Sequence, residues 1–391
     1  LRAITSLPGF DWRLSHENFY RYLSNSYYGL DSSPIKGIKK LVPGHYLEVS
    51  KNNVLLEKYW ESIPGENPLS INYDDAVQRC NELIDRSCKL SMRSDVPYGV
   101  LLSGGIDSSL LMQSCLKQNP ETRAFSVSIK DGEYDELDKF KIICNTLGVK
   151  NVKTYEMHSD SMLQVLNDLF DCIDEPHGDL GYPNLFFLSR HVKKDITVAI
   201  LGDGADELFT GYLPNHATGF ESIIEALPKR LVNFGKQCSE SILPVKNRYM
   251  GLDAVTRAFL GGFPSNPLIR FCIWLSTIDP ERLEKLSKNM GSDFFSRYGQ
   301  NGTLYGPVGN KMEEMANLSR RQQYSYFYQQ VFLPESVCAH TDRAAMQFSV
   351  EMRSPFLSKE IIEFANNIPD EYKYRNFRLK RILRDLAKKN G

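Results

Sequence analysis

Residues 96–111 read VPYGVLLSGGIDSSLL, a pattern typical of a buried strand, a glycine turn and the start of a helix. Residues 98–102 are mostly apolar, as expected for a core strand of a parallel sheet. Residues 103–105 then form a turn without a large side chain, and residues 107–109 open a helix. We therefore expect this loop to lie at the carboxyl end of a buried strand.

Such a loop suits a bound anion. Glycines let a ligand approach the main chain, and the N–H groups and dipole of the following helix favour negative charge. The hydroxyls of Ser108 and Ser109 can add hydrogen bonds, whereas Asp107 would repel a phosphate unless a divalent cation bridges them. The loop lacks the Gly-Lys-Ser/Thr ending of the common nucleotide P-loop and the spaced glycines of the dinucleotide fingerprint. A plain capped glycine turn is the structural alternative.

The run SGGIDSS resembles the pyrophosphate loop of ATP pyrophosphatases of the asparagine synthetase type. This resemblance implies an enzyme that splits ATP between the α and β phosphates and makes an acyl-adenylate. On the resemblance, the ATP-binding residues of this loop are Leu102, Ser103, Gly104, Gly105, Asp107, Ser108 and Ser109.

The composition is that of an ordinary globular protein with two or three domains. The 391 residues are 42% hydrophobic and 24% charged, with a net charge of -1, which gives no basic field for nucleic acid. No apolar run is long enough to cross a membrane. The eight cysteines form no CxxC pair, which argues against a zinc site and a disulfide scaffold. We expect reduced thiols in a cytoplasmic protein.

Strand and helix patterns alternate after residue 96. Strands are expected at 98–102, 123–129, 152–157 and 196–201, and helices at 135–147, 161–170 and 184–192. This rhythm predicts an α/β fold with a doubly wound parallel sheet, which the resemblance makes adenine nucleotide α-hydrolase-like. After residue 212 no strand is expected, and residues 215–390 form a helical C-terminal part. Ligands of such sheets bind at the carboxyl ends of strands.

A second motif follows the strand at 196–201. Residues 202–212 read GDGADELFTGY, and by this geometry they lie at the same edge of the sheet. Asp206 and Asp107 are placed to hold Mg²⁺ on the ATP phosphates, although a capped turn with solvated acids is the alternative. The motif resembles the family's Gly-acid-Gly-small-Asp-Glu block, which adds Gly202 and Asp203 to the ATP site. The family often has Glu in place of Asp203.

A third block lies near the C-terminal end of the sequence. Residues 342–357 resemble the family's run from Asp-Arg-Ala-x-Met to Arg-x-Pro-Phe-Leu. The resemblance implies a phosphate-contacting lysine on the next helix, which Lys380 matches best, and a catalytic set of Lys380, Asp203 and Arg343. Structural ion pairing on helices is the alternative for Arg343, Arg353 and Lys380. A cation in a dry site would stabilise the charge that builds on the α-phosphate and on the leaving pyrophosphate.

The loop at residues 174–184, DEPHGDLGYPN, lies near the acyl-acceptor pocket in the family. It lacks the Thr-Ile-Arg-Ala-Ser run of one family branch, so the identity of the substrate is open. His177 in this loop is expected to act as a hydrogen-bonding residue rather than as a catalyst.

Residues 1–61 are expected to form a separate unit. Residues 15–23 predict a short helix, and 45–49 with 54–60 predict a hairpin. The run at residues 35–49 and the KYW at 58–60 resemble the C-terminal part of the Ntn-type glutaminase domain of these enzymes, without its N-terminal cysteine. The start, LRAITSLPGF, reads like the middle of a domain, so we expect a trimmed piece. A Pro/Gly-rich linker at 62–70 begins the synthetase domain, 62–391.

The sequence thus predicts ATP-dependent amide formation with ATP and Mg²⁺ as cofactors. The default acceptor is aspartate, with ammonia or glutamine as the nitrogen source, and a homodimer is compatible with the sequence. A lactam synthetase, a peptide macrocyclase or a sugar-acid amidotransferase on the same scaffold is one alternative. A tRNA-thiolating pyrophosphatase and a nucleotide-binding remnant are the others.

Overall fold

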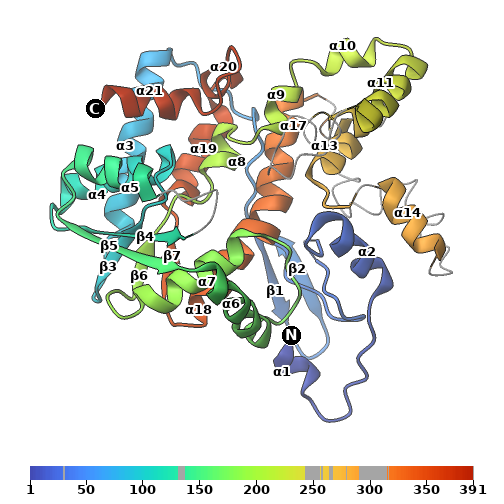
Figure 1. Ribbon diagram of the computed structural model, residues 1–391, viewed down its shortest axis with the longest axis horizontal. Helices are drawn as coiled ribbons and strands as arrows, with labels where there is room; N and C mark the ends of the chain where they lie inside the picture. Colours follow the sequence, from blue (N-terminus) through green and yellow to red (C-terminus); the bar gives the residue numbers. More distant parts are fainter. Residues whose placement is uncertain are drawn as a thin grey trace. The chain divides into compact units, whose positions relative to one another are not determined.

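The computed structural model describes residues 1–29, 31–130, 137–242, 256, 259–263, 267–278, 280–289, 315 and 317–390 (Figure 1). The chain divides into two compact units. Unit 1 comprises Leu1–Glu61, Glu175–Gly178 and Tyr212–Glu335, and unit 2 comprises Ser62–Asp174, Asp179–Gly211 and Ser336–Gly391. The first motif and residues 202–211 of the second belong to unit 2.

Unit 2 is built on a five-stranded parallel sheet in the order β5-β4-β3-β6-β7. Its strands are β3 (Tyr98–Leu101), β4 (Arg123–Ile129), β5 (Asn151–Met157), β6 (Val198–Ile200) and β7 (Glu351–Arg353). Four of these strands lie where the apolar runs predict them, which confirms the α/β class. The neighbouring strands β3 and β6 start the two loops that carry the predicted site, and they pair in parallel through Val100 and Ile200.

The prediction that no strand follows residue 212 is wrong. Strand β7 pairs with β6 at the edge of the sheet, where Met352 faces Ala199 and Arg353 faces Ile200. The strand is three residues long and none of its residues is fully buried. A short edge strand with two charged residues gives no apolar run, so periodicity could not reveal it.

Helices cover both faces of this sheet. One hydrophobic cluster joins β3 to α3 (Tyr73–Ser91), α4 (Ile106–Gln118), α5 (Leu137–Leu147), α8 (Ala205–Phe209), α19 (Lys359–Asn367) and α21 (Arg381–Lys389). Two further clusters join the sheet to α6 (Ser159–Cys172), α7 (Gly181–Val192) and α18 (Ala339–Met346). Successive side chains of a strand point to opposite faces of the sheet, so Val100 packs in the first cluster and Leu101 in one of the others. The sheet is therefore doubly wound, and η3 (Pro355–Leu357) and α20 (Asp370–Lys373) complete the unit.

The predicted helices of unit 2 differ from the observed ones mainly at their ends. Helix α5 begins at Leu137, and the first two residues predicted for it lie outside the described part of the chain. The apolar stripe of α3 is buried from Ala76 to Ser87, but Leu90, one residue before the helix ends, is 47% exposed. In the sequence, Leu90 continues the apolar stripe that starts at Ala76, which predicts its burial. This prediction is wrong, because the packed face does not extend through the last turn.

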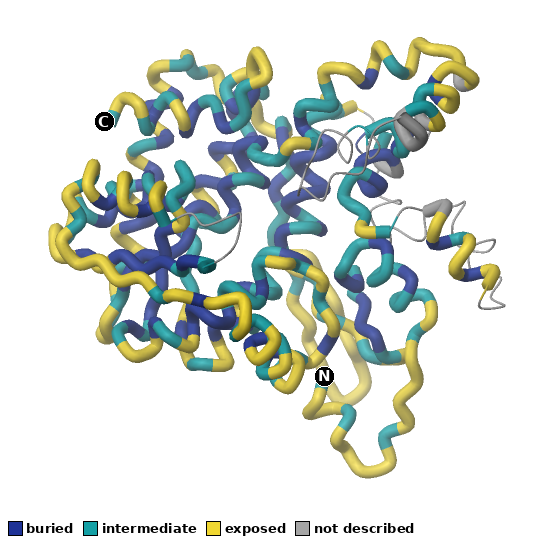
Figure 2. Tube along the Cα trace, in the orientation of Figure 1, coloured by how far each residue is buried: buried dark blue, intermediate teal, exposed yellow. Residues whose placement is uncertain are grey.

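Unit 1 begins with α1 (Arg2–Thr5), α2 (His16–Asn25) and the antiparallel hairpin of β1 (His45–Val49) and β2 (Val54–Lys58). The predicted helix and hairpin are confirmed, with the second strand two residues shorter than expected. Figure 2 shows the hairpin exposed along almost its whole length. The described residues of this unit also form α9 (Pro214–Ala217), α10 (Glu221–Glu225), α11 (Lys229–Ile242), α13 (Pro267–Leu275), α14 (Pro280–Asn289) and α17 (Arg320–Phe327). A π-helix, η2 (Tyr328–Cys338), follows, and its last three residues belong to unit 2. The glycines at residues 306–309 predict a break between helices, and these residues lie outside the described part of the chain.

Aromatic side chains form the core of unit 1. Tyr324 stacks on Phe271 with 4.0 Å between ring centroids, and Tyr328 meets the same ring edge-on. Within unit 1 these tyrosines pack against α13 and α2. Their helical spacing predicted burial but could not identify the partner.

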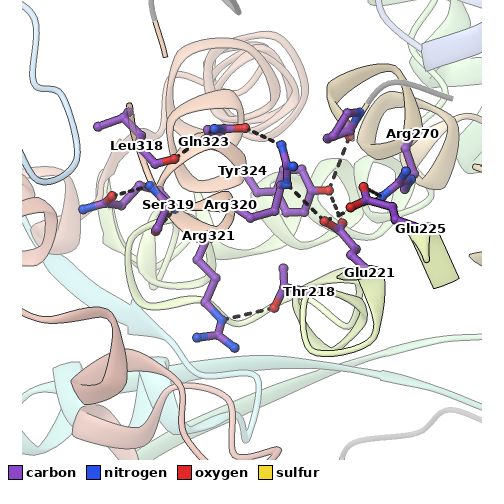
Figure 3. Close-up of polar contacts among 12 residues, drawn as sticks. Thr218, Glu221, Glu225, Arg270, Leu318, Ser319, Arg320, Arg321, Gln323 and Tyr324 are labelled. Carbon is purple, nitrogen blue, oxygen red and sulfur yellow. Dashed lines mark hydrogen bonds and ion pairs between the residues drawn. The ribbon is translucent and has the colours of Figure 1, made fainter. Parts of the chain in front are cut away.

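A buried ion cluster joins three helices of unit 1 (Figure 3). Arg270 on α13 is 2% exposed and lies 2.8 Å from Glu225 and 3.7 Å from Glu221, both on α10. Glu221 also accepts a hydrogen bond from the Tyr324 hydroxyl and forms an ion pair with Arg320, both of α17. The charges of this cluster are therefore paired between helices, as buried charges must be.

Among the helices that the structure describes, none has the length and apolar character needed to cross a bilayer.

Candidate active site

The first loop of the site runs from the end of β3 to the start of α4. Gly104 adopts a left-handed conformation with φ +81°, and a Cβ atom there would lie 2.9 Å from the Cβ of Lys139. A side chain at this position would meet both backbone strain and a clash, so glycine allows the tight turn. Leu102 is buried in the core and Ser103 begins the turn.

Hydrogen bonds within the loop hold its shape. The amide of Ser103 donates to Oγ of Ser108 at 3.3 Å, and the Ser109 hydroxyl donates to the Gly105 carbonyl at 2.6 Å. Gly105 is the N-cap of α4, and no side chain of the described residues caps this helix start. The first-turn amides of this 13-residue helix are therefore oriented to bind an anion, while the serine hydroxyls stabilise the loop itself.

The second loop approaches the first through a glycine. A Cβ atom on Gly202 would lie 3.2 Å from the Cβ of Asp107 and 3.4 Å from the Ser108 amide nitrogen. A larger residue would push the two loops apart. The two motifs therefore lie next to each other in unit 2, as the strand order predicts.

Lys380 joins the two loops at the N-terminus of α21. Its Nζ lies 2.5 Å from Oδ2 of Asp107 and 2.6 Å from Oδ1 of Asp206. The lysine is 8% exposed, and its backbone is left-handed with φ +50°. The three residues predicted as metal ligands and catalytic cation therefore form one cluster, although Lys380 is 273 residues from Asp107 in the chain.

Burial and charge act against each other in this cluster. Burial raises the pKa of Asp107 to about 6, although the Lys380 ammonium opposes this change. Burial alone would lower the pKa of Lys380, but the two carboxylates outweigh it and raise that pKa above its ordinary value. Lys380 is consequently a cation at neutral pH.

The donor set fits a magnesium ion that also binds phosphates. Oδ1 of Asp107 is buried and has no hydrogen-bond partner, and Asp206 supplies a second carboxylate beside it. Mg²⁺ in nucleotide sites usually takes one or two carboxylates and completes its shell with phosphate oxygens and water. No group of three acidic, histidine or cysteine ligands occurs in the described ranges, so an all-protein metal cage is not formed there.

Asp203 is held by a different helix, α18, from the one that carries Lys380. Its side chain accepts a 2.8 Å hydrogen bond from Oγ1 of Thr341 on α18, and burial raises its pKa. The third acid of the motif, Glu207, is 2% exposed and belongs to the interior of the unit. Among the residues that the structure describes, the three acids of this motif do not make up a group that could hold a metal ion by themselves.

The two arginines of the third block differ. Arg353 donates to the carbonyl oxygens of Ser91 and Arg93 at 2.8 and 2.6 Å and pairs with Glu351, so its guanidinium ties β7 to the end of α3. This is the structural alternative raised by the sequence. Arg343 is half-buried on α18, two residues after Thr341. In unit 1, His177 bonds to the Glu335 carbonyl at 3.1 Å, as expected of a hydrogen-bonding loop residue.

Sequence reasoning missed Gly211 and Thr341 as residues of the site. A Cβ atom on Gly211 would lie 1.8 Å from Oδ1 of Asp206 and 2.2 Å from Cε of Lys380. Gly211 was visible at the end of the second motif, yet its partner Lys380 lies far away in sequence. Thr341 carries no chemical signature of its own, because a lone threonine on a helix usually packs.

Comparison with known proteins agrees with this geometry. The family model described as asparagine synthase matches residues 79–390. Asparagine synthetase [glutamine-hydrolyzing] 1 of Bacillus subtilis is 26% identical over 383 residues, which cover 96% of this chain and 57% of the relative. Amidase chyE of Penicillium rubens is 25% identical over 436 residues, covering 99% of this chain and 59% of the relative. The chain thus spans somewhat more than half the length of these relatives.

Among solved structures, the NH3-dependent NAD synthetase from Campylobacter jejuni aligns with a TM-score of 0.25 and 16% identity. The alignment covers 50% of this chain and 99% of that one, and a TM-score this low adds nothing to the fold assignment. The family model covers most of the chain, including both loops, the third block and Lys380. The chain therefore belongs to the asparagine synthase family.

Proposed function

We propose that this chain performs ATP-dependent amide formation as a carbon–nitrogen ligase that releases AMP and pyrophosphate. A carboxylate of the substrate attacks the α-phosphate of ATP, and pyrophosphate leaves. Ammonia, supplied free or from glutamine, then attacks the acyl-adenylate, and AMP departs. Aspartate is the first acceptor to test. Residues 62–391 would carry this chemistry, and residues 1–61 would be the C-terminal part of a glutaminase-like domain.

The observation that carries the proposal is the position of Lys380 between Asp107 and Asp206, beside the uncapped start of α4. A cation and a row of amides at one strand edge can bind a triphosphate and stabilise the charge that builds as pyrophosphate leaves. Asp107 and Asp206 would hold Mg²⁺, which when bound neutralises phosphate charge. Asp203, which is held by α18, would orient the incoming nucleophile, and Arg343 would contribute further positive charge.

A second candidate keeps the chemistry but changes the acceptor. The Penicillium relative is named an amidase, and this chain covers 59% of it. The polar loop at residues 174–184, which the resemblance places near the acceptor, differs from one branch of the family. An acceptor other than aspartate, such as a sugar acid, a lactam precursor or a peptide, is therefore the alternative.

The test is pyrophosphate release from ATP with Mg²⁺ and ammonium, with and without aspartate. Aspartate-dependent pyrophosphate together with asparagine would support the first acceptor. Pyrophosphate release that ignores aspartate would favour the alternative acceptor. No pyrophosphate with any carboxylic acid would contradict the ligase proposal.

Variants of the two carboxylates test the site assignment. Asp107→Asn and Asp206→Asn should each reduce Mg²⁺-dependent turnover by about 10²-fold or more, because each removes charge at the phosphates. Asp85→Asn is the matched control, since Asp85 pairs with Lys117 on the surface between α3 and α4. Near-normal turnover in either site variant would remove that residue from the metal assignment.

A further inference from the structure

Lys380 ends a segment of unit 2 that contains three left-handed residues. Asn376, Phe377 and Lys380 have φ angles of +52°, +57° and +50°. Residues other than glycine rarely adopt this conformation, because the Cβ atom then lies too close to a backbone carbonyl oxygen. Such a backbone persists only where the surrounding structure holds it. The position of the Lys380 side chain therefore depends on the contacts that fix this segment.

Asp385 connects the chain on both sides of Lys380. It lies on α21, after Lys380, and its Oδ1 accepts a 2.7 Å hydrogen bond from Nη2 of Arg378, which precedes Lys380. Its Oδ2 accepts a 2.6 Å hydrogen bond from the hydroxyl of Tyr73, the first residue of α3. One carboxylate thus binds the left-handed segment with one oxygen and a neighbouring helix with the other.

Tyr73 also contacts the residue that follows Lys380. The guanidinium of Arg381 lies over the Tyr73 ring at 3.9 Å from its centroid, and Nη1 of Arg381 donates to the Glu371 carbonyl oxygen of α20 at 2.9 Å. Helix α21 packs against both α3 and α20 (Figure 1). The chain before and after Lys380 is therefore tied to the same tyrosine, through Asp385 on one side and directly on the other.

Asp385 holds these contacts as a charged group. Burial acts to raise its pKa, but the hydrogen bonds from Tyr73 and Arg378 outweigh burial and lower the pKa below its ordinary value. Hydrogen bonds to a carboxylate are stronger than those between neutral groups. The side chains of Arg378 and Asp385 are 38% and 27% exposed, so their ion pair adds little to global stability and acts mainly on the local backbone.

We propose that Asp385 and Tyr73 are positioning residues for Lys380. This inference rests on the proposed function. The two residues hold the left-handed backbone so that the ammonium stays between Asp107 and Asp206, where it stabilises the charge of the leaving pyrophosphate. An ammonium that is displaced from this position stabilises that charge less. Asp385 and Tyr73 themselves do not touch the phosphates and act only through Lys380.

The experiment compares Asp385→Asn, Lys380→Met and the double variant in pyrophosphate release from ATP with Mg²⁺, ammonium and aspartate. In Asp385→Asn kcat should fall about tenfold while the KM for ATP stays within about threefold of wild type, because the cation is displaced rather than lost. The double variant should match Lys380→Met within about twofold, because no ammonium is left to position. Two independent effects would multiply instead.

Asp195→Asn is the matched control. Asp195 accepts a 2.7 Å hydrogen bond from the Tyr155 hydroxyl and lies 2.7 Å from Nζ of Lys153, so it also links a tyrosine to a cation. Its side chain is 23% exposed, close to the value for Asp385, but it precedes β6, whereas the site loops follow β3 and β6. Asp195→Asn should keep wild-type turnover and lower the unfolding temperature about as much as Asp385→Asn does.

Binding of Mg²⁺ alone tests the position of Lys380 without turnover. An ammonium that leaves the two carboxylates makes them available to the metal ion. Mg²⁺ should therefore raise the unfolding temperature of Asp385→Asn more than that of wild type. Tyr73→Phe, which keeps the ring under Arg381 but loses the hydroxyl, should show the same change to a smaller extent. The Mg²⁺ shift of Asp195→Asn should equal that of wild type, because a structural change elsewhere leaves the carboxylates paired.

Three results would overturn the positioning role. The first is wild-type kcat in Asp385→Asn. The second is a double variant whose loss is the product of the two single losses. The third is an equal loss of turnover in Asp195→Asn. Absence of pyrophosphate release in wild type would instead overturn the ligase function. In that case the Mg²⁺ measurement decides the positioning of Lys380, since a larger shift in Asp385→Asn supports it and an unchanged shift overturns it.

Discussion

Two ion clusters of this protein, one in each unit, differ in role: one links helices, and the other belongs to the candidate active site. In unit 1, two arginines and a tyrosine surround Glu221 and Glu225 and link α10, α13 and α17 (Figure 3). In unit 2, a single ammonium, that of Lys380, faces two carboxylates at the carboxyl ends of parallel strands.

The two clusters differ in whether they keep polar atoms and net charge with which a ligand could interact. The unit 1 cluster brings cations and acids together in comparable number, as structural ion pairs do. The unit 2 cluster has an excess of negative charge and leaves Oδ1 of Asp107 buried without a partner. An excess of acid beside an uncapped helix start is suited to bind a metal–phosphate group. Charge imbalance, rather than burial, therefore distinguishes the site.

Removal of the buried arginine should have the largest effect on stability. Arg270→Met leaves Glu221 and Glu225 without their shared cation and should destabilise unit 1 by about 3–5 kcal/mol, as breakage of a buried ion pair does. Thermal and urea unfolding would measure this. Lys288→Met, which breaks the exposed pair with Glu284, is the control and should change stability by less than about 1 kcal/mol. Equal effects of the two variants would show that the buried cluster is not structural.

Removal of Lys380 should affect the reaction more than the fold. Lys380→Met should reduce pyrophosphate release by about 10²–10³-fold, because a preorganised cation is lost. Without this cation Mg²⁺ should raise the unfolding temperature more than it does in wild type, since two carboxylates then face each other. Lys388→Met, on the exposed side of α21, should behave as wild type. A normal rate in folded Lys380→Met would exclude the residue from the site.

Arg353 tests whether a charged residue in a family motif is structural. Arg353→Met loses two hydrogen bonds to carbonyl oxygens and should destabilise unit 2 by about 1–3 kcal/mol, with turnover of the folded protein unchanged. Glu351→Gln, which weakens only the exposed partner, should have a smaller effect. A large fall in turnover at full stability would assign Arg353 to the reaction instead.

Gly211→Ala should give the smallest loss in the set. The added methyl group would overlap the Asp206 carboxylate and the Lys380 side chain, and these can shift slightly. A displacement of this kind should reduce turnover about tenfold, equivalent to about 1.4 kcal/mol, with little change in unfolding temperature. Gly219→Ala is the control, because the nearest atom to its Cβ would be 3.7 Å away. Wild-type turnover in Gly211→Ala would show that the cluster tolerates movement.

The sequence was most informative where local chemistry is unusual. Four strands, the glycine turn with Gly104 and the acids of the second motif could be predicted, because apolar runs and glycines report local backbone constraints. Strand β7 could not, because its pairing depends on β6 rather than on its own residues. The packing of Tyr324 on Phe271 could not be predicted either, because a buried stripe indicates that a helix packs, but not against which element.

The sequence by itself determined four of the five strands of the parallel sheet of unit 2 and the two loops that follow β3 and β6, since these arise from short-range patterns. Only the tertiary structure decided that Lys380 meets Asp107 across 273 residues, that Gly211 leaves room for this contact, and that Arg353 is structural. The physical reason is that ion pairs and steric fit depend on distances between residues that are far apart in the chain. Folding sets these distances, and they cannot be read from the local sequence.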